Sequence, residues 1–332
     1  MKTLNTSHGL TTTPTTSTAP GRSCPLRYRY GAAAMASAPL RTAQTLYLIG
    51  GLYGNLAALD QVEALALAEF DATGQAPTLC FNGDFNWFNT ADSHFAQLNQ
   101  RVLQHHAIQG NVEAELYSPQ DDAGCGCAYP DSVGAAVVQW SNLIHAQLKA
   151  TARRHPALLA RLAQLPMLAR YQVAGCRVGV VHGDADALAG WGFDVQALDN
   201  PQAQPWLQAV FAAADVQVFA SSHTCLPALR QIALTNHRSG LVANNGAAGM
   251  PNFAGDLAGL VTRIGNTPSA HPVLQECQVG SAFVALLPLR FDVARWQADF
   301  LAQWPPGSAA WLSYFERISQ GPAYQPDQAR LR

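Results

Sequence analysis

The chain has 332 residues, with 20 Lys or Arg, 22 Asp or Glu and a formal net charge of −2. Charged residues make up 13% of it and hydrophobic residues 48%, whereas about 25% charged residues is usual in soluble proteins. The balanced charge excludes a general nucleic-acid-binding protein, the apolar content excludes a disordered chain, and no run of about 18 apolar residues predicts a membrane span.

Residues 1–43 contain no acidic side chain and include the Thr/Ser/Pro-rich segment 11–20, TTTPTTSTAP. This composition predicts a disordered N-terminal extension, followed by one domain over residues 44–332. The segment 24–30 (CPLRYRY) is less typical of disorder and is a candidate for packing on that domain. There is no apolar core of a secretory signal, although the arginines of the segment leave an organelle transit peptide as an alternative. Seven cysteines without such a signal favour reduced thiols and a cytoplasmic location.

From residue 45 onward, apolar runs typical of strands alternate with patterns typical of helices. Strands are predicted at 46–49, 79–81, 107–108, 178–181 and 216–220, and helices at 55–69, 92–105 and 206–214, with two more helices interrupted near Pro156. Further strand-like runs lie at 241–243, 260–264 and 282–287, and helices at 292–301 and 309–318 close the chain as a C-terminal extension. This order predicts a largely parallel inner sheet covered on both faces, with antiparallel hairpins after residue 216.

Polar side chains follow four of these strands directly. Asp84 follows the second strand and Asn111 the third, while His182 and His223 follow the next two. Side chains at the carboxyl ends of strands in an α/β sheet converge on one crevice. One carboxylate, one amide oxygen and two imidazoles make a ligand set for a divalent transition metal, and glycines beside three of them permit the necessary tight turns.

The order of these motifs resembles that of the calcineurin-like metallophosphoesterases. The motifs are Gly54-Asn55, Gly83-Asp84, Gly110-Asn111, His182-Gly183, His223-Thr224 and Asn244-x-Gly246, within about residues 46–251. The third, which continues to Glu113, is similar to the GNxD/E motif of a bacterial subgroup. The resemblance implies a four-layered α/β/β/α sandwich with mixed central sheets, metal-dependent hydrolysis of a phosphate mono- or diester, and Asp84, Asn111, His182 and His223 as the second-metal ligands.

The sequence departs from the family at the first metal. Gly51 and Tyr53 stand where the family has the Asp and His of Asp-x-His, and Cys225 stands where it has the last histidine of its fifth motif. The histidine that assists the leaving group in the family is Val112 here. Because Asp84 is the one certain carboxylate, two adjacent divalent ions would repel strongly. We therefore expect a mononuclear or atypical centre, with a metal-activated water and no assignable catalytic side chain.

The sequence is compatible with more than one ligand set and more than one role for the glycine turn. The ion is one divalent transition metal, with Mn, Fe, Zn and Ni not distinguished, and a Cys225 thiolate is an optional further ligand. Asn111 could instead cap a helix, and the glycine turn at 50–54 could cradle a phosphate. A dinucleotide fold is disfavoured because Asp71, which has the required spacing of about 20 residues from the glycine turn, lies before the second strand and not at its end. The expected substrate-binding or outer-sphere positions are Gly51, Tyr53, Asn55, Asn86, Glu113 and Asp184.

The pair Cys125 and Cys127 does not by itself indicate a zinc site, since zinc would require two further ligands. Its alternatives are a structural role in a loop, a place in the substrate pocket, or a redox role. The leading functional hypothesis is a metal-dependent hydrolase of a small phosphate ester or nucleotide, without general nucleic-acid or membrane binding. The alternative is a non-catalytic phosphate- or nucleotide-binding protein with the same fold, and the third option is an interaction protein without metal. The oligomeric state is left open.

Overall fold

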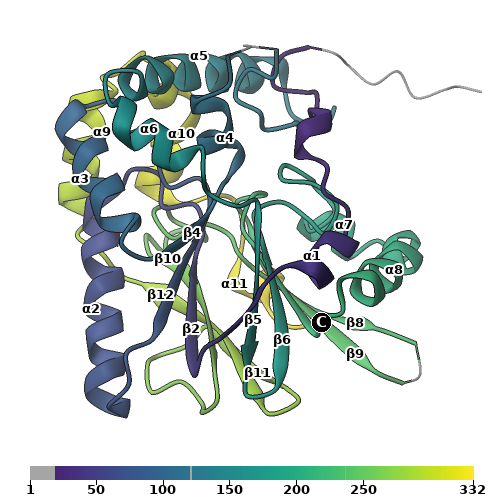
Figure 1. Cartoon of the computed structure of the whole chain (residues 1–332). Coiled ribbons are helices and arrows are strands. Elements are labelled where there is room, and N and C mark those ends of the chain that lie inside the picture. The colour runs from purple at the N-terminus through teal and green to yellow at the C-terminus, as the bar shows by residue number, and fades with distance from the viewer. Residues whose placement is uncertain (1–18, 120–121, 236) are drawn as a thin grey trace, which may run out of the picture.

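The computed structural model describes residues 19–119, 122–235 and 237–332. Two six-stranded mixed sheets face each other, and helices cover their outer faces, which gives four α/β/β/α layers (Figure 1). The predicted four-layered sandwich with mixed sheets is therefore confirmed. Within the described part of the chain, no helix is both long and apolar enough to cross a membrane.

The first sheet carries the N-terminal strands of the fold. Its strand order is β11 (Gln275–Val279), β12 (Ala282–Leu289), β10 (Gly259–Gly265), β2 (Thr45–Ile49), β3 (Thr78–Asn82) and β4 (His106–Ile108). Strands β2, β3 and β4 run parallel, whereas β10, β11 and β12 join by antiparallel pairing. Asp84 follows β3 and Asn111 follows β4, so both lie beyond carboxyl ends of parallel neighbours.

The second sheet carries the two histidine motifs. Its strand order is β1 (Leu40–Thr42), β5 (Leu168–Val173), β6 (Cys176–Val181), β7 (Val218–Ser221), β9 (Ser239–Asn245) and β8 (Pro227–Ala233). Strands β6, β7 and β9 run parallel, and β5 and β8 pair antiparallel to their neighbours. His182 follows β6 and His223 follows β7.

The helices form two unequal layers. On the side of the first sheet and over one end of the sandwich lie α2 (Leu56–Thr73), α3 (Asp92–Val102), α5 (Ala135–Ala152), α6 (Pro156–Leu162), α9 (Val293–Gln303) and α10 (Ala309–Gln320). On the side of the second sheet lie α1 (Ala33–Ser37), α7 (Val195–Leu198) and α8 (Gln204–Ala214). The short helices α4 (Asn111–Leu116) and α11 (Pro326–Ala329), with 3₁₀ turns at Leu26–Tyr28 and Pro201–Ala203, complete the chain.

The strands alternate between two cores, as the two-residue period of a strand requires. Leu46 and Leu48 of β2 pack in the cluster between the sheets, which also contains Val178 of β6. Tyr47 and Ile49 of the same strand pack in the cluster beneath the helices. Burial on both faces explains why the inner strands read as continuous apolar runs in the sequence.

The predicted disordered extension 1–43 is wrong for residues 19–43, which form a 3₁₀ turn, α1 and β1. Met35 of α1 is 1% exposed, and β1 pairs with β5. The Arg170 side chain also donates a hydrogen bond of 2.7 Å to the Ala36 carbonyl. The composition of this segment is typical of disorder, but its apolar side chains pack against the second sheet. The remainder of that prediction, residues 1–18, lies outside the described residues.

Besides β1, the strands β5, β8 and β11 are absent from the prediction based on apolar runs. Each contains polar residues such as Arg170, Arg230 or Glu276. Strands β8 and β11 lie at sheet edges, where a polar face is normal. The Arg230 guanidinium is buried but pairs with the Asp199 carboxylate at 2.5 Å.

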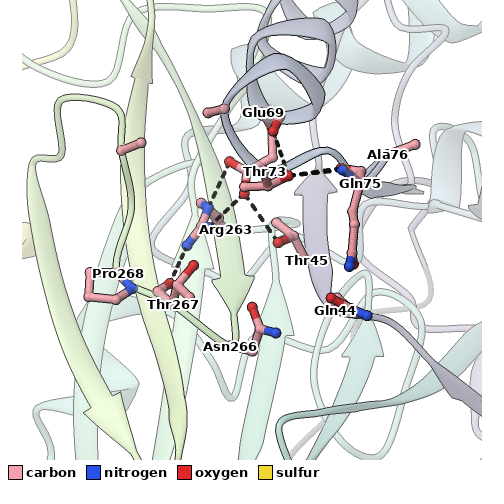
Figure 2. A pocket seen from close by; sticks show the side chains of 12 residues that line it. Gln44, Thr45, Glu69, Thr73, Gln75, Ala76, Arg263, Asn266, Thr267 and Pro268 are labelled. Atoms are coloured by element: carbon pink, nitrogen blue, oxygen red, sulfur yellow. Dashed lines mark hydrogen bonds and ion pairs between the residues drawn. The ribbon is translucent and has the colours of Figure 1, made fainter.

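A buried ion pair joins α2 to the first sheet near the amino end of β2 (Figure 2). The Arg263 guanidinium contacts the Glu69 carboxylate at 2.7 and 3.1 Å, and both side chains are 1% exposed. Tyr47 and Thr45 donate further hydrogen bonds to Glu69. The adjacent cavity of 430 Å³ is separate from the side chains that follow β3, β4, β6 and β7. We assign this ion pair to stability.

Candidate metal centre

The four predicted ligand residues come together at the carboxyl ends of their strands. Donor atoms of Asp84, His182 and His223 all lie within 4.8 Å of one another. His182 Nε2 is 3.3 Å from Asp84 Oδ1, 3.1 Å from Asn111 Oδ1 and 3.1 Å from His223 Nδ1. All four residues are buried. His182 Nε2 thus stands at the centre of a compact group of oxygen and nitrogen donors.

Close-packed turns place Asp84 and Asn111 side by side. A Cβ atom at Gly83 would lie 2.6 Å from the backbone of Gly110 and 2.6 Å from His182 Nδ1. A Cβ atom at Gly110 would lie 2.2 Å from Asp84 Oδ1. Only glycine permits these approaches. Gly110 is also the N-cap of α4, so Asn111 is the first helical residue and directs its side chain to His182 instead of capping the helix.

Backbone carbonyls fix the tautomers of both histidines. The Nδ1–H group of His182 donates to Asn82 O at 2.9 Å, and the Nε2–H group of His223 donates to Cys127 O at 3.1 Å. Since a carbonyl only accepts, the remaining lone pairs, on His182 Nε2 and His223 Nδ1, face each other at 3.1 Å. A cation relieves this opposition, and the second-sphere carbonyls orient the rings as in metal sites. The donor set therefore fits a divalent transition metal.

Without an ion, a proton on His182 Nε2 would relieve the same opposition of lone pairs. Burial opposes the charged form of His182, but the Asp84 carboxylate outweighs it and raises the pKa of His182 above its usual value. Burial would raise the pKa of Asp84, yet His182 and His223 hold it below its usual value. Burial and the neighbouring His182 lower the pKa of His223 to about 3. His223 is therefore neutral near pH 7, the form in which imidazole binds metal.

Glu113 lies behind the donors and holds their loops. Its carboxylate accepts hydrogen bonds from the backbone N–H groups of Asp84 at 2.8 Å, Gly110 at 3.1 Å and Asn86 at 3.1 Å. The Asn86 side chain donates to the same carboxylate at 3.2 Å. Burial and the nearby Asp84 carboxylate raise the pKa of Glu113 to about 7. Glu113 and Asn86 thus fix the turns that carry Asp84 and Asn111.

Two other expected positions lie further out. Asn55 is the N-cap of α2, where it accepts from Ala58 N at 2.9 Å and donates to Gly249 O at 3.0 Å. Asp184 accepts hydrogen bonds from the backbone N–H groups of Asp186, Ala187 and Gly192. It therefore holds the loop that carries Trp191 and neither begins a helix nor orients a histidine ring.

Tyr53 contacts both of the other residues that stand at the expected first-metal positions, Gly51 and Cys225. Tyr53 Oη lies 2.8 Å from Cys225 Sγ. A Cβ atom at Gly51 would lie 2.9 Å from the Tyr53 ring. Tyr53 itself is 3% exposed. Burial raises the pKa of Tyr53 well above its usual value and also raises that of the Cys225 thiol. The space beside Asp84 is therefore filled by a neutral ring and a protonated thiol.

A cavity of 260 Å³ opens onto the donor group. Asp84, His223, Thr224 and Cys225 form its polar part, together with Arg317 from α10. Aromatic side chains line much of the remainder: Trp87, Tyr129, Trp191 and Tyr314. The Trp191 ring meets the His223 ring edge-on at 5.3 Å between centroids. The shape suits a small molecule that has one anionic group and one apolar group.

Sequence reasoning missed the role of the Cys125–Cys127 loop. The Cys125 carbonyl accepts from Asn111 Nδ2 at 2.9 Å, and the Cys127 carbonyl accepts from both His223 and Trp191. The backbone of this loop thus orients two of the proposed ligands, and its thiols are free. The signal was the alternation with Gly124 and Gly126, whose φ angles of 59° and 69° favour glycine. No comparable sequence signal marks Arg317.

No protein-family model matches the sequence, and no curated protein matches it significantly. Solved structures do match. A hypothetical protein from Pyrococcus horikoshii OT3 aligns at 13% identity over 85% of this chain and 100% of its own, with a TM-score of 0.55. A metallophosphoesterase from Sphaerobacter thermophilus aligns at 17% identity over 84% of this chain and 100% of its own, with a TM-score of 0.52. The chain therefore has the same fold as this metallophosphoesterase, with two mixed sheets between layers of helices.

Proposed function

We propose that this protein is a metal-dependent hydrolase of a small phosphate mono- or diester. One divalent ion would be held by Asp84 Oδ1, Asn111 Oδ1, His182 Nε2 and His223 Nδ1. The observation that carries the proposal is the opposition of the two histidine lone pairs at 3.1 Å beside a buried carboxylate. The fold, shared with a metallophosphoesterase, supports it.

A bound divalent ion supplies Lewis acidity toward the phosphoryl group and toward water. The residues of the chain supply orientation and exclusion of solvent. The Asn82 and Cys127 carbonyls hold the two imidazoles, and Glu113 holds the turns that carry Asp84 and Asn111. The aromatic walls cover the apolar part of the substrate and keep bulk water away from the centre.

The leaving group receives no proton from a side chain in this proposal. Val112 lines the cavity at the position where the resemblance implies a histidine, and Glu113 is engaged with backbone N–H groups behind the donors. Without a general acid, esters of acidic alcohols should react fastest, because their leaving groups need little protonation. Aryl phosphates are the preferred test substrates.

We propose a single ion because the residues at the positions where the resemblance implies first-metal ligands contact each other instead. The Tyr53 ring lies against Gly51, its hydroxyl engages Cys225, and Asp84 is the one carboxylate among the cavity-lining residues described. The runner-up function, a non-catalytic phosphate-binding protein, is favoured by the same three substitutions. The presence of all four residues that the resemblance implies as second-metal ligands supports the hydrolase instead.

Metal analysis and hydrolysis of aryl mono- and diesters test the proposal together. The wild-type protein should hold one ion per chain and show metal-dependent turnover, and His182→Ala should lose both. The matched control is His105→Ala, since His105 is exposed and contacts none of the donors. Two ions per chain, both lost in Asp84→Ala, would contradict the single-ion centre. One bound ion without turnover on any ester would favour the binding protein.

A further inference from the structure

Arg317 brings a cation to the cavity from the C-terminal helix α10. Its Nη2 donates to Cys225 O at 2.7 Å and its Nε donates to Pro251 O at 3.2 Å. Both bonds hold the planar guanidinium in one orientation. Nη1 has no hydrogen-bond partner among the described residues, and the side chain forms no ion pair within that part of the chain. The group is thus fixed in position but keeps donor capacity.

The surroundings of Arg317 leave its charge uncompensated. Among the described residues that line the cavity, it is the one Lys or Arg side chain. Tyr53 and Cys225 line the cavity beside it, and neither side chain carries a carboxylate. The guanidinium therefore stands beside the space filled by the Tyr53–Cys225 pair, on the same cavity as Asp84 and His223. A positive group therefore lies on the same cavity wall as Tyr53 and Cys225, the residues at which the sequence departs from the family pattern.

We propose that Arg317 binds the phosphoryl oxygens of the substrate, in place of a second metal ion. The inference rests on the proposed function for the identity of the anion. Guanidinium N–H groups form short, charge-assisted hydrogen bonds with phosphate oxygens, and their fixed plane adds directional selectivity. Ser313 lies four residues earlier on α10 and lines the same cavity, so its hydroxyl lies on the same helix face.

The aromatic walls fix the other half of the substrate. With the phosphoryl group between Arg317 and the donor set, the ester alcohol extends along Trp191, Tyr129 and Tyr314. The apolar character of these walls and the 260 Å³ volume select a small aryl or otherwise apolar alcohol. The substrate class is therefore a small phosphate ester whose alcohol carries no charge.

Binding of inorganic phosphate to the metal-loaded full chain, measured by calorimetry, tests the assignment. Arg317→Gln should weaken phosphate binding about tenfold or more, because it removes a charge-assisted hydrogen bond. Arg317→Lys should retain part of the affinity, since it keeps the charge but not the fork. Arg290→Gln is the control, because Arg290 is exposed and pairs with Asp256 outside the cavity. Wild-type phosphate affinity in folded Arg317→Gln would overturn the proposal.

Metal content separates this proposal from the proposed function. Arg317→Gln should bind the same number of ions as the wild type, whereas a wild-type protein without any ion would contradict the metal centre alone. Alkylation of the wild-type protein gives a readout that depends on no variant. Phosphate should slow the alkylation of Cys225, which lines the cavity, and leave Cys277 on β11 unaffected. Equal alkylation of Cys225 with and without saturating phosphate would overturn the Arg317 assignment.

Discussion

The Tyr53 hydroxyl lies 2.8 Å from the Cys225 sulfur, although the two residues are 172 positions apart in the chain. Tyr53 follows β2 in the first sheet and Cys225 follows β7 in the second, so their contact bridges the two halves of the sandwich. Each replaces a histidine that the family resemblance implies. The two replacements are complementary, because the ring fills space that a metal ion would need and the hydroxyl pairs with the thiol.

This packing predicts that Gly51→Ala lowers the free energy of unfolding by more than its positive φ angle alone would explain. Gly51 and Gly74 both have positive φ angles, of 65° and 71°, so alanine at either should cost about 1–2 kcal/mol of backbone strain. Gly74→Ala is the matched control, since nothing lies within 4 Å of its added Cβ. Gly51→Ala should cost about 1–3 kcal/mol more, because it displaces the Tyr53 ring. Urea unfolding measures both.

The extra cost should disappear in a Tyr53→Ala background if the ring is its source. A double-mutant cycle of Gly51→Ala and Tyr53→Ala therefore isolates the contact. Equal destabilisation by Gly51→Ala in both backgrounds would show that the ring does not occupy the space beside residue 51.

The donor group predicts that a divalent ion stabilises the folded chain. An ion that binds only the folded state at about 100 times its Kd adds about 2.7 kcal/mol to the free energy of unfolding. Thermal unfolding of the wild type should therefore shift upward with added Mn²⁺ or Zn²⁺, and Asp84→Ala should abolish the shift. Asp131→Ala is the control, because Asp131 is exposed and outside the centre. A shift of wild-type size in Asp84→Ala would argue against these ligands.

The N-terminal segment should contribute to metal affinity through α4. Tyr28 is fully buried and its hydroxyl donates to Glu115 of α4, which Arg27 also contacts at 2.6 Å. Asn111 is the first residue of that helix. A chain that begins at residue 44 should therefore bind metal more weakly than one that begins at residue 19, and should lose at least about 3 kcal/mol of stability.

Competition with a chelator measures the affinities of these two chains, and urea unfolding measures their stabilities. Equal metal affinity in both chains would mean that the segment does not position Asn111.

Breaking the Glu69–Arg263 pair should destabilise the fold without touching the metal centre. Both side chains are 1% exposed, and removing one partner of a buried pair leaves an uncompensated charge at a cost of about 3–5 kcal/mol. Glu69→Gln should lower the free energy of unfolding by about that amount, with unchanged metal content. Asp327→Asn, in a pair whose carboxylate is 87% exposed, should change it by less than about 1 kcal/mol. A cost for Glu69→Gln as small as that of the control would contradict the assignment.

The Glu69 carboxylate also predicts that the free energy of unfolding depends on pH. Burial alone would raise the pKa of Glu69, but hydrogen bonds from Arg263 and Tyr47 outweigh it and lower the pKa below its usual 4.5. A carboxyl whose pKa is lowered on folding contributes stability that is present above its unfolded pKa and lost as the pH falls through its folded pKa. The stability difference between wild type and Glu69→Gln should therefore shrink as the pH falls below about 4.5. A difference that stayed constant from pH 7 to pH 3 would show that Glu69 is not ionised in the fold.

Much of the inner architecture follows from local patterns in the chain. Apolar runs marked the strands that carry Asp84, Asn111, His182 and His223, since strands buried on both faces contain few polar residues. Polar edge strands such as β8 and β11 carry no such signal. The segment 19–43 was misread because its composition resembles disorder, whereas its packing depends on a few apolar side chains such as Met35.

Four candidate donor residues can be identified from the sequence, because each follows an apolar strand and glycines nearby permit tight turns. The contact of Tyr53 with Cys225, the bond from His223 to the Cys127 carbonyl and the place of Arg317 on the cavity are visible in the folded chain alone. The reason is physical. Strand period and turn chemistry are encoded within a few neighbouring residues, whereas a contact across 92 or 172 positions depends on how distant segments pack. The low charge of the chain extends to this cavity, where Asp84 is the one carboxylate among the described lining residues and Tyr53, Cys225 and Arg317 lie together on the wall.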